Sequence, residues 1–264
     1  MKLLINFLPT GLGDRLQYNI KKIPYLKSKF KQLDIYASWK INNQCLANFE
    51  DLFKNVYNIN FVDELFSEED LLKNEEEICS KLNIKPIDLT HKALPKENTH
   101  KVLQIKDEIL NEILSLQKKY QIDKSVIGIH LRVPENFDFK NPEKILDKDP
   151  SYANWKAKHL MDNLSVLEKN YDFLKNKRVL VFSDSKELIE EMLLKYDNFF
   201  TIDECEKLPI DNKKGISHVR RSKESVIAGL KAAGLLSLCN YNNKIKLRLT
   251  SNFSKIPTWI KIGN

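Results

Sequence analysis

The chain has 264 residues, of which 42% are hydrophobic and 30% charged, enough apolar side chains for one large or two moderate domains. The formal net charge is +7, which favours anionic partners such as a nucleotide-linked substrate. We find no run of about 18 uncharged apolar residues, which argues against a membrane span.

The first stretch of the chain predicts a Rossmann-type unit. Residues 2–8 are apolar and typical of a buried strand, whereas a signal peptide would need a longer apolar run and a cleavage site. A turn with Gly11 and Gly13 follows, and helical spacing begins after Arg15. The glycines allow close approach of a ligand to the backbone, and Asp14 can cap the helix. Without a third glycine, the turn only weakly indicates a dinucleotide site, and we expect no such cofactor.

The remainder of the first half alternates between expected helices and strands. Ser67, followed by three acids, predicts the beginning of a helix. The expected strands cover residues 33–37, 59–62 and 84–89, and the expected helices cover residues 42–56, 67–82 and 99–120. We place the domain boundary so that one domain covers residues 1–122 and the other residues 123–264.

The central stretch of the second half is Ser125 to Glu135. Its apolar run around Ile127 predicts a buried strand, and His130 and Arg132 stand at the carboxyl end of that strand. Ligands of open α/β sheets bind beyond the carboxyl ends of the strands. The pattern therefore predicts an anion site, with a solvated or ion-paired histidine and arginine as the alternative.

Further strands and helices follow a long polar loop over residues 133–150. We expect helices over 152–173 and 186–196 and one that Ser222 caps, and strands over 178–182, 199–202 and 244–249. Strand and helix alternate in both halves, which predicts an α/β fold with parallel sheets. Polar side chains follow three of these strands: Ser183 and Asp184, Asp203, and residues 250–254.

The four cysteines lie far apart and form no C-x-x-C pair, and the five histidines form no H-x-x-x-H. We therefore expect no metal site, and we interpret the cysteines as reduced thiols of a cytoplasmic protein.

The order of the polar clusters resembles that of the GDP-fucose-dependent fucosyltransferase superfamily, which includes α1,2-, α1,6- and protein O-fucosyltransferases. The family's G-x-G-N/E-R loop matches residues 11–15, and its H-x-R-R-x-D signature matches residues 130–135. Its F-S/T-D segment matches residues 182–184, and its S-S-F-S-like segment matches residues 251–254. The resemblance implies a GT-B-like architecture of two Rossmann-like domains, with the donor held mainly by the second.

The resemblance also implies an inverting, metal-independent transfer of fucose from GDP-fucose, or from another GDP-sugar, to a glycan or protein hydroxyl. Arg132 would stabilise the departing diphosphate, and Asp14 or Glu135 would accept the acceptor's proton. Asp184 or, by its family position, Asp203 would bind guanine. The residues expected to bind the nucleotide sugar are Gly11, Gly13, Arg15, His130, Arg132, Ser183, Asp184, Asp203, Ser251, Asn252, Phe253 and Ser254.

Two departures from the family pattern leave other functions open. Val133 stands where the signature has a second arginine, and Glu135 replaces its aspartate. Arg15, Arg220 and Arg221 are candidates to supply the missing cation. The alternatives are an inactive transferase-like fold and a basic module that binds nucleic acid or an anionic surface. Scattered lysines argue against nucleic acid, whereas peripheral contact with a membrane stays open.

Overall fold

The computed structural model describes residues 1–42, 44–89, 94, 103–133, 152–205, 222–241, 245, 247, 252–260 and 262. Its contacts divide the chain into two compact units. Unit 1 comprises Met1–Leu110, Leu208–Ile227 and Thr258–Gly263, and unit 2 comprises Asn111–Lys207, Ala228–Pro257 and Asn264. The domains expected over residues 1–122 and 123–264 stay a prediction.

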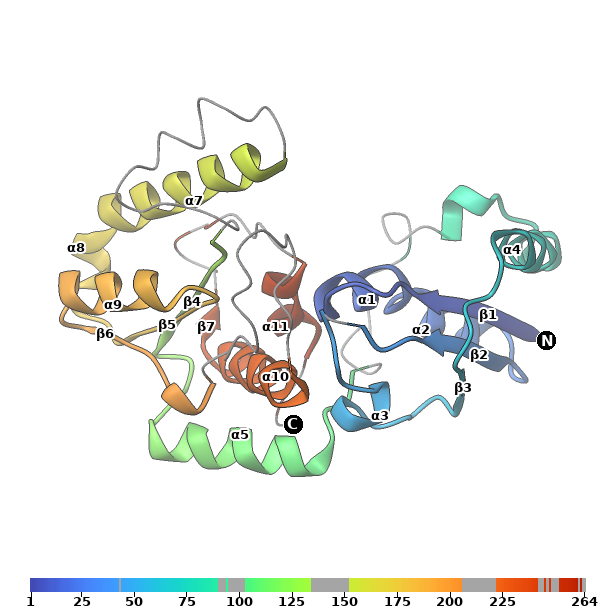
Figure 1. The fold of residues 1–264 in the computed structure, drawn as a ribbon, viewed down its shortest axis with the longest axis horizontal. Coiled ribbons are helices and arrows are strands. Elements are labelled where there is room, and N and C mark those ends of the chain that lie inside the picture. Colours follow the sequence, from blue (N-terminus) through green and yellow to red (C-terminus); the bar gives the residue numbers. More distant parts are fainter. Residues whose placement is uncertain are drawn as a thin grey trace. The chain divides into compact units, whose positions relative to one another are not determined.

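Unit 1 is built on a parallel sheet of three strands in the order β1-β2-β3 (Figure 1). The alternating burial along β1 arises because every second side chain turns toward the core. The strands are β1 (Lys2–Phe7), β2 (Asp34–Trp39) and β3 (Ile59–Val62). The helices that lie wholly in this unit are α1 (Leu12–Asn19), α2 (Lys22–Lys29), α3 (Phe49–Leu52), α4 (Glu68–Leu82) and the 3-10 helix η1 (Pro86–Leu89).

The outer edge of β1 is covered by side-chain amides rather than by a fourth strand. Asn74 of α4 accepts a hydrogen bond from the Leu4 N–H and donates one to the Lys2 carbonyl. Asn6 makes the equivalent pair of bonds with the backbone of Phe66. The Asn74 bonds satisfy backbone groups of β1 itself, and the Asn6 bonds satisfy the backbone of Phe66 just before α4.

Unit 2 is built on a parallel sheet of four strands in the order β6-β5-β4-β7 (Figure 1). All five residues of β4 are buried, as expected for a strand covered on both faces. The strands are β4 (Ile127–Leu131), β5 (Val179–Ser183), β6 (Phe199–Phe200) and β7 (Asn240–Tyr241). The helices are α7 (Tyr152–Lys169), α8 (Tyr171–Leu174), α9 (Lys186–Lys195), η3 (Asp203–Cys205) and η4 (Phe253–Lys255).

Three further helices each have residues in both units: α5 (Asp107–Lys119), α10 (Lys223–Leu238) and α11 (Ile256–Trp259). Within unit 2, α10 packs closely on β4 at Gly128. A Cβ atom at Gly128 would lie 2.9 Å from both the Cβ of Cys239 and the Cδ2 of Leu236. This position favours glycine because side-chain atoms of Leu236 and Cys239 already occupy the space that a Cβ would need.

The opposite face of the central strands carries the main core of unit 2. Ile129 and Val181 of the sheet pack there with Leu160 of α7 and Leu188 of α9. The predicted α/β fold with parallel sheets is therefore confirmed. Among the helices that the structure describes, none is both long enough and apolar enough to cross a membrane. All four cysteines are buried thiols that form no disulfide.

Three sequence predictions are wrong in detail. The helix expected over residues 42–56 is only the four-residue α3, because Asn42 and Cys45 pair in a tight turn before it. The strand expected over 84–89 is a 3-10 helix, in which Asp88 accepts a hydrogen bond from the Lys85 N–H. The helix expected over 99–120 begins at Asp107. Most of the strand expected over 244–249, and the loop from residue 134 to 150, lie outside the described residues.

Candidate functional site

The carboxyl ends of β4 and β5 bring Arg132 and Asp184 together. The two strands pair in parallel with Leu131 opposite Ser183, so the next residue of each strand also falls beside its neighbour. Nη1 of Arg132 forms an ion pair with Oδ2 of Asp184, and the Val133 N–H donates to Oδ1 of Asp184 at 3.0 Å. The ion-paired alternative for Arg132 is thus realised in this structure.

Both charged side chains of this pair are largely removed from water. Arg132 keeps 18% of its side-chain surface exposed, and Asp184 keeps 10%. Val133 is buried and supplies only its backbone N–H. The position of the signature's second arginine is therefore occupied by a core side chain.

His130 lies in β4, two residues before Arg132, and its side chain connects the strand to η4. Its Nδ1 is 2.8 Å from Oγ of Ser254, and its ring centroid is 5.3 Å from that of Phe253. His130 and Ser254 are both buried. The Tyr241 hydroxyl donates to the Ser254 carbonyl at 2.7 Å, and burial raises the pKa of Tyr241. Ser254 is thus held by one hydrogen bond from β4 and one from β7.

The remaining candidates of unit 2 have separate local roles. Ser183 accepts a hydrogen bond from the Ser185 N–H just before α9, and Asn252 accepts one from Lys255. Asp203 is exposed in η3, and no hydrogen bond or ion pair joins it to the other candidates within the described part of the chain. Glu135, Ser251, Arg220 and Arg221 lie outside the described residues.

In unit 1 the glycine turn is the beginning of α1. Gly11 is the N-cap, and no side chain hydrogen-bonds to the helix there. Asp14 lies in the first turn of the helix and is exposed, so the expectation that Asp14 itself is the cap is wrong. A carboxylate in the first turn still interacts favourably with the helix dipole. Gly13 is buried within the helix.

Gly11 is not required by the protein's own packing. Its φ of −63° and ψ of 156° are accessible to any residue. Among the described residues, a Cβ there would meet only Oδ2 of Asp14 and Oε1 of Gln44, both at 3.9 Å, which is ordinary van der Waals contact. The described part of the chain therefore leaves space beside this backbone.

Arg15 is buried beneath the glycine turn. Its Nε donates to the Thr10 carbonyl at 2.7 Å, its Nη2 donates to Oδ1 of Asn42 at 2.9 Å, and its guanidinium lies 4.9 Å from the Trp39 ring centre. Nη1 is buried without a hydrogen-bond partner, and no acid pairs with Arg15 among the described residues. Burial lowers the pKa of Arg15, although the nearby Cys45 opposes this effect.

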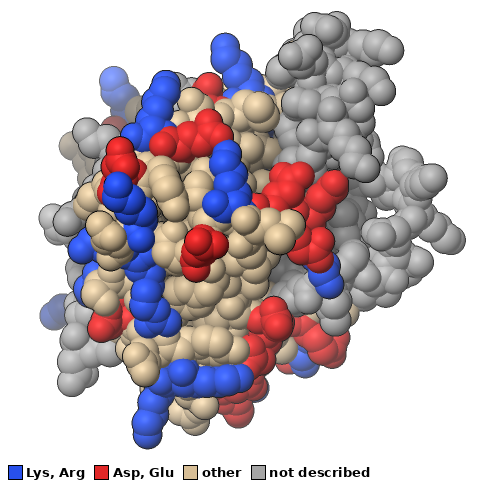
Figure 2. Space-filling model, turned by 90° about the vertical axis from the view of Figure 1, so that its left-hand side faces the viewer, with Lys and Arg blue, Asp and Glu red and all other residues tan. Residues whose placement is uncertain are grey.

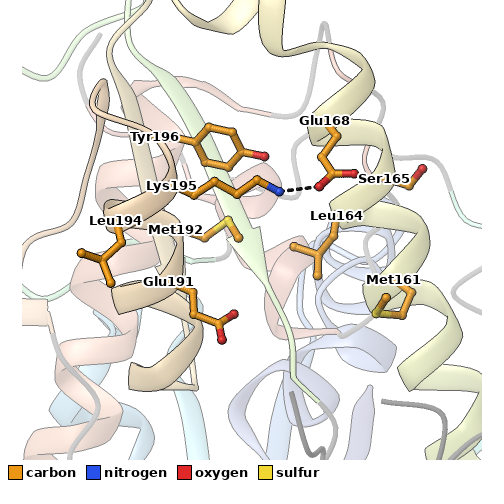
Figure 3. A pocket seen from close by; sticks show the side chains of 9 residues that line it. All are labelled: Met161, Leu164, Ser165, Glu168, Glu191, Met192, Leu194, Lys195 and Tyr196. Carbon is orange, nitrogen blue, oxygen red and sulfur yellow. Dashed lines mark hydrogen bonds and ion pairs between the residues drawn. The ribbon is translucent and has the colours of Figure 1, made fainter. Parts of the chain in front are cut away.

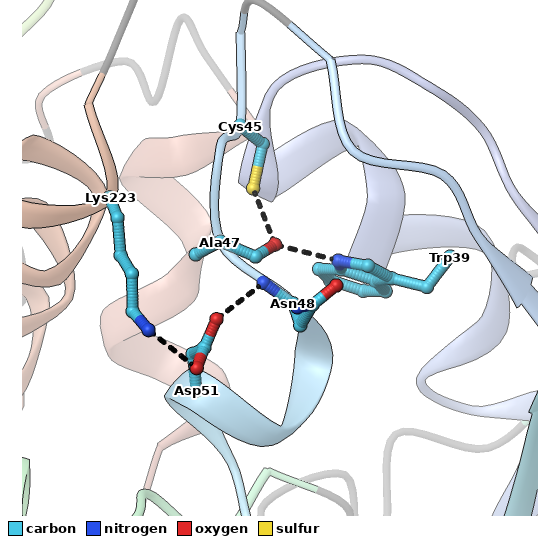
Figure 4. Close-up of polar contacts among 6 residues, drawn as sticks. All are labelled: Trp39, Cys45, Ala47, Asn48, Asp51 and Lys223. Carbon is cyan, nitrogen blue, oxygen red and sulfur yellow. Dashed lines mark hydrogen bonds and ion pairs between the residues drawn. The ribbon is translucent and has the colours of Figure 1, made fainter. Parts of the chain in front are cut away.

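A second contact in unit 1 joins the beginning of α10 to α3 (Figure 4). Nζ of Lys223 lies 2.7 Å from Oδ1 of Asp51, and the Asn48 N–H donates to Oδ2 at 2.9 Å. Beside it, the Trp39 indole N–H donates to the Ala47 carbonyl at 2.8 Å. Lys223 is thus both half exposed and an ion-pair partner of Asp51.

A pocket of about 530 Å³ lies between α7 and α9 in unit 2 (Figure 3). Its walls are mainly apolar, and the ion pair between Glu168 and Lys195 crosses it. The lining residues are Met161, Leu164, Ser165, Glu168, Glu191, Met192, Leu194, Lys195 and Tyr196. None of the residues expected to bind the donor lines this pocket.

Two residues that organise these regions were not predicted. Asn42 binds Arg15 and also donates to the Pro9 carbonyl, so it joins the ends of β1 and β2. The adjacent asparagines 42 and 43 are a turn signal that could have identified it. Tyr241 fixes Ser254, and no sequence motif singles it out. Within the described residues, no three His, Cys, Asp or Glu side chains gather to hold a metal ion.

No protein-family model matches the chain, and no curated protein matches it in sequence. Solved structures do match. NodZ α-1,6-fucosyltransferase co-crystallised with GDP has 12% identity and a TM-score of 0.57, covering 98% of this chain and 92% of that chain. Selenomethionine NodZ from Bradyrhizobium has 13% identity and a TM-score of 0.57, covering 98% and 92%. NodZ soaked with GDP-fucose has 13% identity and a TM-score of 0.55, covering 98% and 93%. The resemblance to the GDP-fucose-dependent fucosyltransferases is therefore confirmed at the level of the fold, which this chain shares over nearly its whole length.

Proposed function

We propose that this protein is a glycosyltransferase that moves fucose from GDP-fucose to a hydroxyl group of a glycan or a protein. The observation that carries the proposal is the carboxyl end of β4 in the second sheet, where Arg132 follows the strand and His130, within the strand, is hydrogen-bonded to Ser254. Ligands of open α/β sheets bind at such an edge. The solved structures of NodZ with GDP and with GDP-fucose, which have the same fold, support this assignment.

The chemistry that the proposal requires matches these side chains. The acceptor oxygen attacks C1 of fucose from the face opposite the diphosphate and inverts that carbon. The bond between C1 and the phosphate oxygen breaks, and its electron pair leaves with GDP. A guanidinium can bind two oxygens of the departing diphosphate, and one such donor contributes about 2.7–4 kcal/mol to the transition state. Arg132 is the candidate for this contact.

The proton of the acceptor hydroxyl passes to a carboxylate in this mechanism. Asp14 and Glu135 are the candidates, and Asp14 is exposed in the first turn of α1. The Gly11 backbone, with open space beside it, would face the sugar or the diphosphate. We infer a GT-B arrangement, with no metal or other cofactor in the reaction. A cytoplasmic location stays a prediction.

A basic binding module is the less supported alternative. On the face that Figure 2 shows, lysines and arginines alternate with acids rather than forming a continuous basic surface. Several lysines of unit 2 are ion-paired, among them Lys119 with Glu204 and Lys175 with Asp172. An alternating surface of this kind favours a small anionic ligand over a nucleic-acid backbone.

Titration calorimetry with GDP tests the proposal. The wild-type protein should bind GDP, and Arg132→Gln should weaken binding by about tenfold or more because a charge-assisted contact to phosphate is lost. Arg178→Gln is the matched control. Arg178 precedes β5 at the opposite end of the same sheet, where it donates to the Tyr120 and Gln121 carbonyls. This control variant should bind GDP like the wild type.

Three outcomes are decisive. No binding of GDP at millimolar concentration contradicts a GDP-sugar transferase. Equal weakening by both substitutions contradicts the role of Arg132. Binding of GDP without hydrolysis or transfer from GDP-fucose would instead identify the inactive transferase-like fold that Val133, in place of an arginine, leaves open.

A further inference from the structure

Asp184 belongs to a motif that was expected to contact guanine, but its carboxylate is engaged within the protein. Oδ2 forms the ion pair with Arg132, and Oδ1 accepts the Val133 N–H. Guanine would present two donors, N1–H and N2–H, to the same two oxygens. Both oxygens of this carboxylate already accept from the protein, so a base would have to compete with the Arg132 guanidinium and the Val133 N–H for them.

The geometry gives this carboxylate a different use. Arg132 has a long side chain with considerable rotamer freedom, and it stands just beyond the end of β4. The parallel register of Leu131 with Ser183 sets the neighbouring Asp184 beside it. The Val133 N–H holds the Asp184 carboxylate in place. Through the ion pair, the carboxylate can then hold the orientation of the Arg132 guanidinium.

We propose that Asp184 is a positioning residue that holds the Arg132 guanidinium in the orientation that meets the donor diphosphate. This inference rests on the proposed function. Asp184 touches neither the sugar nor the base and acts only through Arg132. Binding of the guanosine part of the donor then depends on other residues, whereas binding of the diphosphate depends on the pair.

A double-mutant cycle on nucleotide affinity tests this role. The variants are Asp184→Asn, which retains an oxygen to accept the Val133 N–H, Arg132→Gln, and the two combined. Asp184→Asn should weaken GDP binding by about tenfold, and it should add less than about twofold once Arg132 is already replaced. Guanosine, which lacks the phosphates, should bind Asp184→Asn and the wild type equally. Asp184→Glu, which restores the charge, should recover part of the GDP affinity.

Several results would overturn the inference. Equal losses for guanosine and GDP in Asp184→Asn would mean that Asp184 reads the base. Additive losses in the double variant, or unchanged or tighter GDP binding by Asp184→Asn, would mean that Asp184 does not act through Arg132.

Glu168→Gln is the matched control, because it removes the acid of another ion pair of unit 2, at the pocket between α7 and α9. It should bind GDP like the wild type. Failure of the wild type to bind GDP would instead remove the proposed function and, with it, this inference.

Discussion

Each of the two parallel sheets has an arginine at its carboxyl edge, and the two arginines differ in nearly every physical respect. Arg15 in unit 1 is 1% exposed, stacks on Trp39 and has no acid partner among the described residues. Arg132 in unit 2 retains 18% of its side-chain surface and is paired with Asp184. A buried charge without a partner is costly, whereas a paired and partly exposed one remains accessible to a ligand.

The difference indicates a division of roles. Arg15 uses two nitrogens on the Thr10 carbonyl and on Asn42, so it clamps the glycine turn to the loop after β2. Arg132, just beyond the end of β4, is instead ion-paired with the carboxylate of Asp184, which follows β5. We interpret Arg15 as the residue that shapes its edge and Arg132 as the residue that meets the ligand.

Replacing each arginine by lysine should separate these roles with the largest effects. Lysine keeps the charge but loses the planar fork. Arg132→Lys should lower the rate of fucose transfer by about a hundredfold or more, because a diphosphate contact is lost, with little change in stability. Arg15→Lys should lower the free energy of unfolding by about 1–3 kcal/mol, since one ammonium cannot replace both hydrogen bonds and the stacking.

Steady-state kinetics and urea unfolding measure the two effects. An Arg15→Lys protein that unfolds like the wild type but no longer binds GDP would make Arg15 the ligand-contacting cation. Arg15 would then substitute for the arginine that is missing at Val133. The ligand-binding role would belong to Arg15 rather than to Arg132.

Two glycines, Gly11 of unit 1 and Gly128 of unit 2, provide a smaller contrast. Gly128→Ala should lower the free energy of unfolding by about 1–3 kcal/mol, because its Cβ would lie 2.9 Å from Cys239 and Leu236. Gly11→Ala should change stability by no more than about 0.5 kcal/mol in either direction, since its Cβ meets nothing closer than 3.9 Å. Urea unfolding of both variants checks this difference. A destabilised Gly11→Ala protein would show that the glycine serves the fold rather than a ligand.

Most of the strands and the Ser67 cap could be predicted because their causes are local, whereas the cap of α1 and the strand over residues 84–89 were predicted wrongly. The apolar run of β4 and the Ser67 cap of α4 are visible in a few consecutive residues. The pair of Arg132 and Asp184 could not be predicted, because it depends on the register of two strands separated by about 50 residues. Its members were named, but not their contact.

The burial of Arg15 was missed for a related reason. It depends on Asn42, whose side chain replaces helical hydrogen bonds with a turn, while apolar spacing over the same residues favours a helix. Local side-chain bonding of asparagine competes with helix formation in this way. Residues at strand ends were therefore found by pattern, and their partners only by structure.

The ion pairs of the two units allow a last and smallest contrast, now in pH. Burial alone would raise the pKa of Asp51, but hydrogen bonds from Lys223 and the Asn48 N–H outweigh that effect and lower it. A carboxyl whose pKa is lower in the folded state stabilises the protein above its unfolded pKa of about 3.9, and this contribution disappears as the pH falls through the folded pKa.

Because Lys223 is half exposed, Asp51→Asn should lower the free energy of unfolding by less than about 1 kcal/mol at pH 7. Urea unfolding from about pH 5 to about pH 3 should show the difference between Asp51→Asn and the wild type shrinking. A difference that stays constant over this range would mean that Asp51 contributes through neutral hydrogen bonds and that its ion pair with Lys223 adds nothing to stability.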